Sequence, residues 1–513
     1  MNEQANNPKL SMATILPTLI FAALSLIPLV LYEKESAAAL DGFFNWFKTT
    51  FGSMYLLLGL ASLGICLTLA FSKYGKIKFG EPDEKPQFST PTWVAMLFCT
   101  GVAGGVLYWS IAEPLYYLAY PPFYAAPLST EAFTWAGCYT FFHWGPLPWS
   151  FYIICSLPLG YVFFVRKKNL LRVSASCDDL FGDRVRRPVG VTLDILFAIG
   201  LLASNISIAG FTVPMVAEAF STATGLQADY SMQLGVLAVI AAIYFTSTFM
   251  GLEKGIARLS NFNVGVAIAM LCFVIVIGPT SFLLDNFVNG VGNFMQNFFR
   301  MSTWTDPYTA GTFPQDWTMF YWAYWITYAP LTGLFVARIS RGRTIKQIVI
   351  HGLCFGMLGA WVIHGVFGGY TLFTQLTAAA GSSPIDVMKT AGIFPAIASV
   401  LTTLPMKILM LLSFCVFSVI FFATSLDSSA YAIALACTDN LDEKATPSCA
   451  HRMFWAVILA VIPAGLLKVG GLSALKGCVN VAAIPMTIIS VLMVVALFKV
   501  IGQDKKSGRL KLD

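Results

Sequence analysis

The stretch Phe141–Tyr152, "FFHWGPLPWSFY", places a histidine, two tryptophans, a tyrosine, a glycine and two prolines inside an apolar run that extends over residues 130–165. An apolar run of this length is typical of a membrane-spanning helix, which needs about 20 residues. Pro146 and Pro148 each lack the backbone N–H that a helix uses, and each ring clashes with the preceding turn. The stretch therefore predicts a membrane helix that is interrupted near its centre.

The whole chain has the composition of a membrane protein. Of its 513 residues 57% are hydrophobic and only 11% are charged, and the mean hydropathy is +0.72. Soluble domains carry about 25% charged residues, so a separate soluble domain is not expected. We predict twelve membrane spans, at roughly 11–32, 51–72, 91–120, 130–165, 190–220, 233–251, 260–284, 316–338, 346–374, 400–437, 453–468 and 478–500.

The basic residues predict the orientation of these spans. Most of the 32 lysines and arginines fall in the loops 73–85, 166–187 and 338–346 and near the two ends of the chain, which all lie on one side if the span number is even. Cytoplasmic loops carry such an excess of basic residues, so both termini are expected in the cytoplasm. The net charge of +6 is then a feature of topology and requires no nucleic-acid partner.

Catalytic and metal-binding signatures are missing from the sequence. The eleven cysteines have no CxxC or paired spacing, and no HExxH, GxSxG or P-loop motif occurs. We therefore expect neither a cofactor nor an enzyme. A carrier is the favoured class, and a channel or a small-molecule receptor is the alternative, because broken helices and deep aromatic residues also line pores.

Two further spans contain helix-weakening or polar stretches. "TGVAGGVLYW" (100–109) holds Gly101 and Gly105, which either let helices pack closely or mark an unwound, substrate-lining segment. "FFATSLDSS" (421–429) holds four hydroxyls and Asp427, which either bond within the protein or face a bound cation. Asp427 is expected to pair with a distant Arg or Lys, Glu113 to cap a broken helix before Pro114, and His143 to be a packing residue.

The aromatic residues predict the ligand. If the helix is loosened at 145–148, Trp144, Trp149 and Tyr152 converge, and a second aromatic set follows at 317–328, where Trp325, Tyr328 and Thr332 share a helix face. Aromatic faces attract a weakly hydrated cation, and a trimethylammonium group fits best. A box of this kind without an adjacent carboxylate suits a zwitterion, which brings its own counter-charge. The alternative is an interfacial aromatic belt, which Trp317 could join.

Three stretches resemble the betaine/carnitine/choline transporter family: "HWGPLPW" (143–149), "FYWAYWITYAP" with "ARISRGRT" (320–344), and "TDPYTAGTFPQDWT" (305–318). The resemblance covers essentially the whole chain. It implies one all-α transmembrane domain, 1–513, with twelve membrane helices: an N-terminal pair (11–72) and two LeuT-like inverted five-helix repeats (91–284 and 316–500). A periplasmic surface helix (287–301), a cytoplasmic tail (501–513), alternating access, and a homotrimer among the lipids of a bacterial inner membrane are also implied.

The resemblance also implies the binding residues. The substrate set is Trp144, Trp149, Tyr152, Tyr117, Tyr324, Trp325, Tyr328, Thr332 and Gly105, and the Na⁺ set is Cys99 and Val102 through their carbonyls with Phe421, Thr424 and Ser425. Choline carriers of the family tend to have an aspartate near Gly105, so the glycine favours a zwitterion.

The residues that distinguish the branches of the family do not all indicate the same branch. "FHWGPLPW" and "YYLAYPPF" (116–123) are most similar to the carnitine/γ-butyrobetaine antiporters, which run without sodium. That branch typically has an arginine where this chain has Asn263, and it lacks hydroxyls at 424 and 425. We therefore expect a Na⁺-coupled secondary transporter of a trimethylammonium zwitterion, with sodium-independent substrate:product antiport as the alternative.

Overall fold

The computed structural model describes residues 9–101, 104–168, 172–181, 183–250, 255–309, 311–439, 446–469 and 472–510, and this part of the chain is almost entirely helical. The single sheet is an antiparallel pair of two-residue strands, β1 (Lys9–Leu10) and β2 (Thr438–Asp439). The all-α fold that the resemblance implies is therefore confirmed.

The first half of the chain forms the helices α1 to α9. Their bounds are α1 Met12–Leu31, α2 Glu33–Phe71, α3 Thr90–Gly101, α4 Gly104–Ala119, α5 Thr130–His143, α6 Pro146–Gly160, α7 Asp183–Thr224, α8 Tyr230–Met250 and α9 Gly255–Ile277. Shorter turns of helix lie at η1 (Lys73–Lys76), η2 (Tyr161–Val165) and η3 (Ser174–Leu180).

The second half begins with α10 (Thr280–Thr303) and a π-helical turn, η4 (Pro314–Met319), that leads into α11 (Phe320–Ile339). Then follow α12 (Ile345–His351), η5 (Gly352–Gly356), α13 (Met357–Ile363), η6 (His364–Gly368), α14 (Gly369–Thr377), α15 (Pro384–Ala391), α16 (Ile393–Thr402), α17 (Lys407–Ala436), α18 (Cys449–Val469) and α19 (Leu472–Lys506).

Ten helical segments in the described residues are long and apolar enough to cross a membrane, or eleven if α3 and α4, which are bent by 52° at their junction, form one span. The predicted span 316–338 corresponds to α11, which is not among them. Its tryptophan, tyrosine and threonine side chains make it less apolar than its neighbours. The total of twelve spans and the inverted repeats thus stay predictions from the sequence.

Three predicted boundaries were wrong. The span 260–284 ends early, because α9 stops at Ile277 and the Gly278–Pro279 pair separates it from α10, which contains the expected surface helix 287–301. The span 400–437 starts late, since Pro405 and Met406, with φ of 57°, separate α16 from α17. The span 51–72 is the second half of α2, which begins at Glu33.

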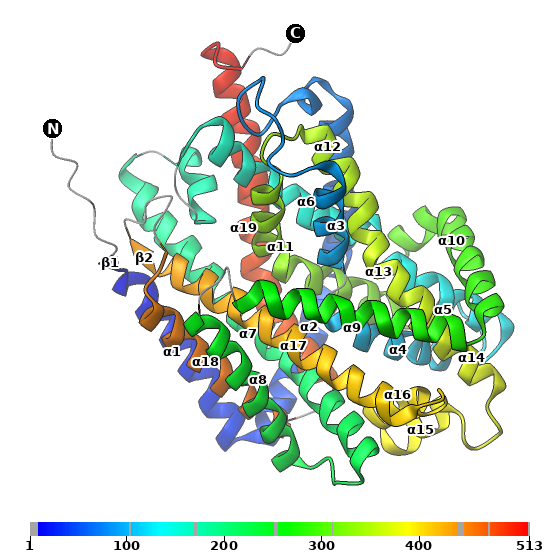
Figure 1. The fold of residues 1–513 in the computed structure, drawn as a ribbon. Coiled ribbons are helices and arrows are strands. Elements are labelled where there is room, and N and C mark those ends of the chain that lie inside the picture. Colours follow the sequence, from blue (N-terminus) through cyan, green and yellow to red (C-terminus); the bar gives the residue numbers. More distant parts are fainter. Residues whose placement is uncertain are drawn as a thin grey trace.

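The helices form one bundle in which α6 and α11 lie against each other, α19 and α7 pack on this pair, and α17 packs on α7 (Figure 1). Side chains far apart in sequence meet at one end of this bundle: Arg166 pairs with Asp504 at 2.9 Å, and Arg172 pairs with Asp439 at 2.9 Å beside the N-terminal strand. We call it the terminal end, because both ends of the described chain lie there. The opposite end carries α10 and α15 (Figure 1).

Candidate substrate and ion site

The break between α5 and α6 places the carbonyls that hold the site together. α5 ends at His143, Gly145 follows in an extended conformation, and Pro146 opens α6. A Cβ at Gly145 would lie 2.6 Å from the carbonyl oxygen of Phe141, so a larger residue would displace the turn. The break frees two carbonyls: that of His143 accepts from Trp325 Nε1 at 3.1 Å, and that of Phe141 from Trp361 Nε1 at 2.9 Å.

Three aromatic rings surround Trp325. Its ring centroid lies 5.2 Å from that of Trp144, 5.7 Å from that of Trp149 and 4.8 Å from that of Tyr152. Trp149 is 0% exposed, whereas Tyr152 is half-buried. We call these four residues the aromatic box. The expected convergence of Trp144 with Trp149 and Tyr152 thus takes place through Trp325, which lies between them.

Three further members of the predicted substrate set lie on α11, and Gly105 on α4 lies close to one of them. Tyr324 stacks on Phe320, and a Cβ at Gly105 would lie 2.8 Å from the Tyr324 hydroxyl oxygen. Tyr328 and Thr332, further along the helix, are half-buried. The hydroxyl of Tyr328 and the indole nitrogen of Trp149 have no hydrogen-bond partner among the described residues. Two donors near the box are therefore free for a ligand.

Tyr117 lies outside the box. Its hydroxyl is 2.7 Å from Nδ1 of His143, and its ring packs on Phe313 and Trp317. Nε2 of His143 is 3.0 Å from the hydroxyl of Thr318. Both ring nitrogens of His143 thus have partners, which agrees with the packing role expected for this residue. Tyr117 joins a layer of aromatic residues between the box and the end of the bundle opposite the termini.

A buried acidic side chain, Glu113, contacts the box at Trp144, and this role was not predicted from the sequence. Glu113 is 0% exposed, and its Oε1 accepts a hydrogen bond of 2.7 Å from Nε1 of Trp144, while Oε2 has no partner in the described part of the chain. Glu113 lies inside α4, so the expected capping role is wrong. The expectation of a box without an adjacent carboxylate is corrected as well. An acidic residue in an apolar span was the available signal.

The two glycines in the third predicted span have different roles. A Cβ at Gly101 would lie 2.1 Å from the carbonyl oxygen of Gly356, so α3 and η5 are in backbone contact there. Gly105 instead faces the Tyr324 hydroxyl beside the box. Both alternatives for this stretch therefore have support: Gly101 permits close packing, and Gly105 lies at the start of α4, beyond a bend of 52°.

Part of the predicted ion set lies on one face of α17. Phe421, Thr424 and Ser425 are half-buried, and the hydroxyls of Thr424 and Ser425 both donate to the carbonyl of Phe421, at 2.8 and 3.1 Å. A hydroxyl that donates its hydrogen keeps its lone pairs, so both oxygens can still accept a cation. Cys99 is half-buried near the end of α3, and Val102 lies outside the described residues.

Two other polar residues, Asp427 and Asn263, have surroundings that bear on their expected roles. Asp427 accepts a hydrogen bond of 2.7 Å from the hydroxyl of Thr248 and interacts electrostatically with the distant Arg452, without an ion pair at contact distance among the described residues. Asn263, on α9, is buried against the bundle, and its Oδ1 has no hydrogen-bond partner among the described residues. The described residues contain no cluster of His, Cys, Asp and Glu that could hold a metal ion.

The side chains of α11 become more exposed toward the terminal end of the bundle. On α11 the side chains of Phe320, Tyr324 and Trp325 are buried, whereas Tyr328 and Thr332 are half-buried. The half-buried face of α17 continues from Phe421 through Thr424 and Ser425 to Ser428 and Tyr431. Its outward-facing apolar side chains, Leu409, Leu412 and Val416, lie on another face. The half-buried residues of α11 and α17 thus lie on the side of Trp325 that is nearer the terminal end.

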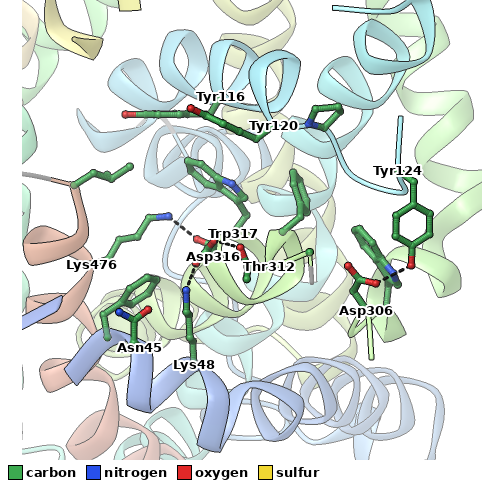
Figure 2. Close-up of a pocket in the computed structure, with 16 residues that line it drawn as sticks. Asn45, Lys48, Tyr116, Tyr120, Tyr124, Asp306, Thr312, Asp316, Trp317 and Lys476 are labelled. Carbon is green, nitrogen blue, oxygen red and sulfur yellow. Dashed lines mark hydrogen bonds and ion pairs between the residues drawn. The ribbon is translucent and has the colours of Figure 1, made fainter. Parts of the chain in front are cut away.

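At the other end, the buried Trp317 closes the way to the box. Above it lies a cavity of about 600 Å³ whose lining includes Lys48, Tyr116, Asp316, Trp317 and Lys476 (Figure 2). The ring of Trp317 packs on those of Tyr116 and Tyr117. A buried aromatic box inside a bundle of membrane-spanning helices is suited to binding a small ligand on its way through the bundle.

Comparison with known proteins agrees with a carrier. The sequence model of BCCT, the betaine/carnitine/choline family transporter, matches residues 13–506. A carnitine transporter of Acinetobacter baumannii is 32% identical over 95% of this chain and 88% of its own length. The uncharacterized transporter YeaV of Escherichia coli is 34% identical over 87% of this chain and 92% of its own length. The glycine betaine transporter OpuD of Bacillus subtilis is 31% identical over 89% of this chain and 88% of its own length.

These relatives are transporters, not enzymes, and the family match spans nearly the whole chain. The match includes the broken fourth span, the helix α11 and the hydroxyl-bearing face of α17, which together make up the candidate site. The chain belongs to the betaine/carnitine/choline transporter family and is a multi-pass membrane transporter.

Proposed function

We propose that the protein carries a trimethylammonium zwitterion of the betaine or carnitine type across a bacterial inner membrane by alternating access, with Na⁺ as the coupling ion. The observation that carries the proposal is the convergence of Trp144, Trp149 and Tyr152 on Trp325. A desolvated cation–π contact contributes about 2 kcal/mol or more, and several rings around one quaternary ammonium act together. Ammonium groups that carry N–H would leave those donors unpaired in such a site.

Two observations favour a zwitterion over choline. Trp149 Nε1 and the Tyr328 hydroxyl lack partners in the described residues, so donors for a ligand carboxylate are available. Gly105, at the position where choline carriers of the family tend to have an aspartate, offers no counter-charge and faces the hydroxyl of Tyr324. Glu113 lies behind Trp144 and is hydrogen-bonded to the indole N–H, so its carboxylate reaches the ligand only through that ring.

Sodium coupling is supported by the face of α17. The carbonyl of Phe421 and the hydroxyls of Thr424 and Ser425 lie together on a half-buried face, and α17 packs against α4, the helix that follows the break. Oxygen ligands from an interrupted helix are the usual sodium ligands in carriers of this kind. The competing function is sodium-independent antiport. It is favoured by the similarity of residues 116–123 and 142–149 to the carnitine/γ-butyrobetaine antiporters.

The orientation follows from the charges at the terminal end. Arg166, Lys167 and Lys168 lie there, and so do Arg341 and Arg343, whose loop bonds to the backbone of Phe79. Cytoplasmic loops carry such an excess of basic residues. We therefore place the half-buried faces of α11 and α17 on the cytoplasmic side of the box, and the cavity above Trp317 on the periplasmic side. A homotrimer in contact with membrane lipid is proposed from the family resemblance.

The test is transport by the purified protein in proteoliposomes. Labelled glycine betaine, carnitine, γ-butyrobetaine and choline are each offered alone and in competition, and empty liposomes provide the background. We expect saturable uptake of a zwitterion, inhibited by the other trimethylammonium zwitterions more strongly than by choline. If no trimethylammonium compound is taken up or competes, the proposal is overturned.

The coupling ion is tested on the same vesicles. With an inward Na⁺ gradient and no internal substrate, uptake should exceed the equilibrium level, and replacement of Na⁺ by K⁺ should remove this accumulation. Unchanged uptake in K⁺, together with a requirement for internal substrate, would replace symport by antiport and leave the assigned ligand class intact.

A further inference from the structure

Lys476 is a buried cation at the cavity above Trp317. It lies near the start of α19, is only 3% exposed, and points from the cavity wall toward Asp316 and Trp317 (Figure 2). Burial of an ammonium group is costly unless other groups compensate for the lost water. The partners of Lys476 therefore show which contacts hold it in place.

The compensation comes mainly from aromatic rings. Nζ of Lys476 lies 3.8 Å from the ring centroid of Trp317, 4.9 Å from that of Phe320 and 5.6 Å from that of Phe44. It donates one hydrogen bond, of 2.5 Å, to the backbone carbonyl of Asp316. A cation over the face of an indole in a desolvated site is strongly attracted. Lys476 thus binds both the ring of Trp317 and the backbone of η4.

The carboxylate of Asp316 is engaged elsewhere. Its Oδ1 pairs with Lys48 at 2.6 Å, and its Oδ2 accepts from the hydroxyl of Thr312 at 2.6 Å (Figure 2). The two lysines therefore have different partners: Lys48 holds the side chain of Asp316, whereas Lys476 holds its carbonyl and the neighbouring indole. Lys48 is a matched control for the effect of a positive charge at this place.

Trp317 is the floor of the cavity and the first of a series of rings that leads to the box. It packs on Trp109 at 6.3 Å between ring centroids, Trp109 packs on Tyr321 at 5.3 Å, and Tyr321 packs on Trp144 at 6.0 Å. A ligand that enters from this end must displace Trp317. The residue lies in a π-helical turn, and such turns often occur at sites of functional rearrangement.

We propose that Lys476 is the positioning residue of the outer gate. Its ammonium holds Trp317 and the π-helical turn against α2 and α11 while the box is exposed to the cytoplasm, and it leaves the indole when the periplasmic side opens. The inference rests on the proposed alternating access and orientation. Loss of the cation should favour the outward-open state, in which the half-buried face of α17 becomes covered.

The test uses a cysteine reporter on that face. Ser428 is half-buried, one turn beyond Thr424, and is replaced by cysteine in a chain in which the exposed Cys272 and Cys354 and the half-buried Cys449 are serine. The rate of modification by a membrane-impermeant thiol reagent is measured in inside-out vesicles without substrate or sodium. The same chain with serine at 428 gives the background.

In this chain Lys476→Met should lower the rate of modification about fivefold or more, because the apolar side chain removes the cation but keeps the length. Lys476→Arg should restore the rate to within twofold, since a guanidinium also stacks on indole. Lys48→Met should change the rate less than Lys476→Met. An unchanged rate in Lys476→Met, or an equal decrease in Lys48→Met, overturns the proposal.

A second variant and an assay without substrate or sodium allow the test to decide in every case. If Lys476→Met is not recovered as a folded protein, Trp317→Leu removes the partner ring and should lower the rate in the same way, and an unchanged rate overturns the proposal. The assay needs neither substrate nor sodium, so failure of transport in proteoliposomes together with the expected labelling pattern would contradict the proposed function and support the gate.

Discussion

The indole N–H of Trp144 donates a hydrogen bond of 2.7 Å to Oε1 of Glu113, a carboxylate that is fully buried in α4. Trp144 follows the last residue of α5, where the helix is broken, so the backbone alone does not fix its ring. The bond to Glu113 orients the indole against Trp325. Glu113 is therefore a positioning residue for the aromatic box.

Glu113→Gln should weaken substrate binding. Glutamine keeps the size but replaces one of the two carboxyl oxygens by an NH₂ group that cannot accept from the indole, and a lost hydrogen bond costs about 1 kcal/mol, so the Kd should rise roughly fivefold. Binding is measured by tryptophan fluorescence or calorimetry on the purified protein. The control is Glu131→Gln, because Glu131 accepts from Trp135 at 3.3 Å on the exposed part of α5. An equal effect of both variants would contradict the assigned role.

Trp325→Leu should reduce affinity more than any other single change in the box, because three of the ring contacts include Trp325. Leucine retains apolar volume but has no quadrupole, and the loss should be about 0.5–2 kcal/mol, or roughly 2- to 30-fold in Kd. Trp322, on the same helix, is fully buried and packs on Phe142 and His143. Trp322→Leu should lower thermal stability and leave the Kd of the remaining folded protein near its original value.

The double variant Thr424→Ala with Ser425→Ala should raise the sodium concentration that gives half-maximal uptake, because two of the proposed oxygen ligands are removed. Substrate binding at saturating Na⁺ should persist, since neither hydroxyl belongs to the aromatic box. Ser428→Ala is the control: its hydroxyl donates to the carbonyl of Thr424 at 2.9 Å, one turn further along the same helix. A sodium dependence identical in all three proteins would remove this face of α17 from the ion site.

Gly356→Ala should disturb the box without changing any of its residues. A Cβ at Gly356 would lie 2.3 Å from the ring of Trp149, so the indole must shift. We expect the Kd for substrate to rise by about tenfold or more, since a misplaced ring loses much of its contact with the ammonium. Gly292→Ala, on α10, is the control, because its Cβ would meet no atom within 4 Å. Unaltered affinity in Gly356→Ala would show that Trp149 does not contact the ligand.

Hydrophobic runs were sufficient to predict most helices, because a segment that crosses lipid must satisfy its backbone internally and carry apolar side chains. The break at 144–145 was predictable for the same reason: glycine and two closely spaced prolines cannot continue a regular helix. The breaks at Pro405 and at Gly278–Pro279 were not predictable in this way, because each lies between two apolar segments that hydropathy alone does not separate. The start of α2 at Glu33 was missed because its first turns are polar.

The aromatic content of 141–152 and 317–328, and the hydroxyls at 424 and 425, were determined by the sequence alone, and they indicate a cation-binding carrier. The partners of these residues were decided only by the tertiary structure. Trp144 and Trp149 meet through Trp325, 181 and 176 positions away in sequence respectively, and Tyr117 joins a different layer although it lies close to the box in the chain. Neither the bond from Trp144 to Glu113 nor the contact of Lys476 with Trp317 follows from sequence spacing. Such contacts depend on the packing of separate helices, which brings together charges and rings that no local pattern connects.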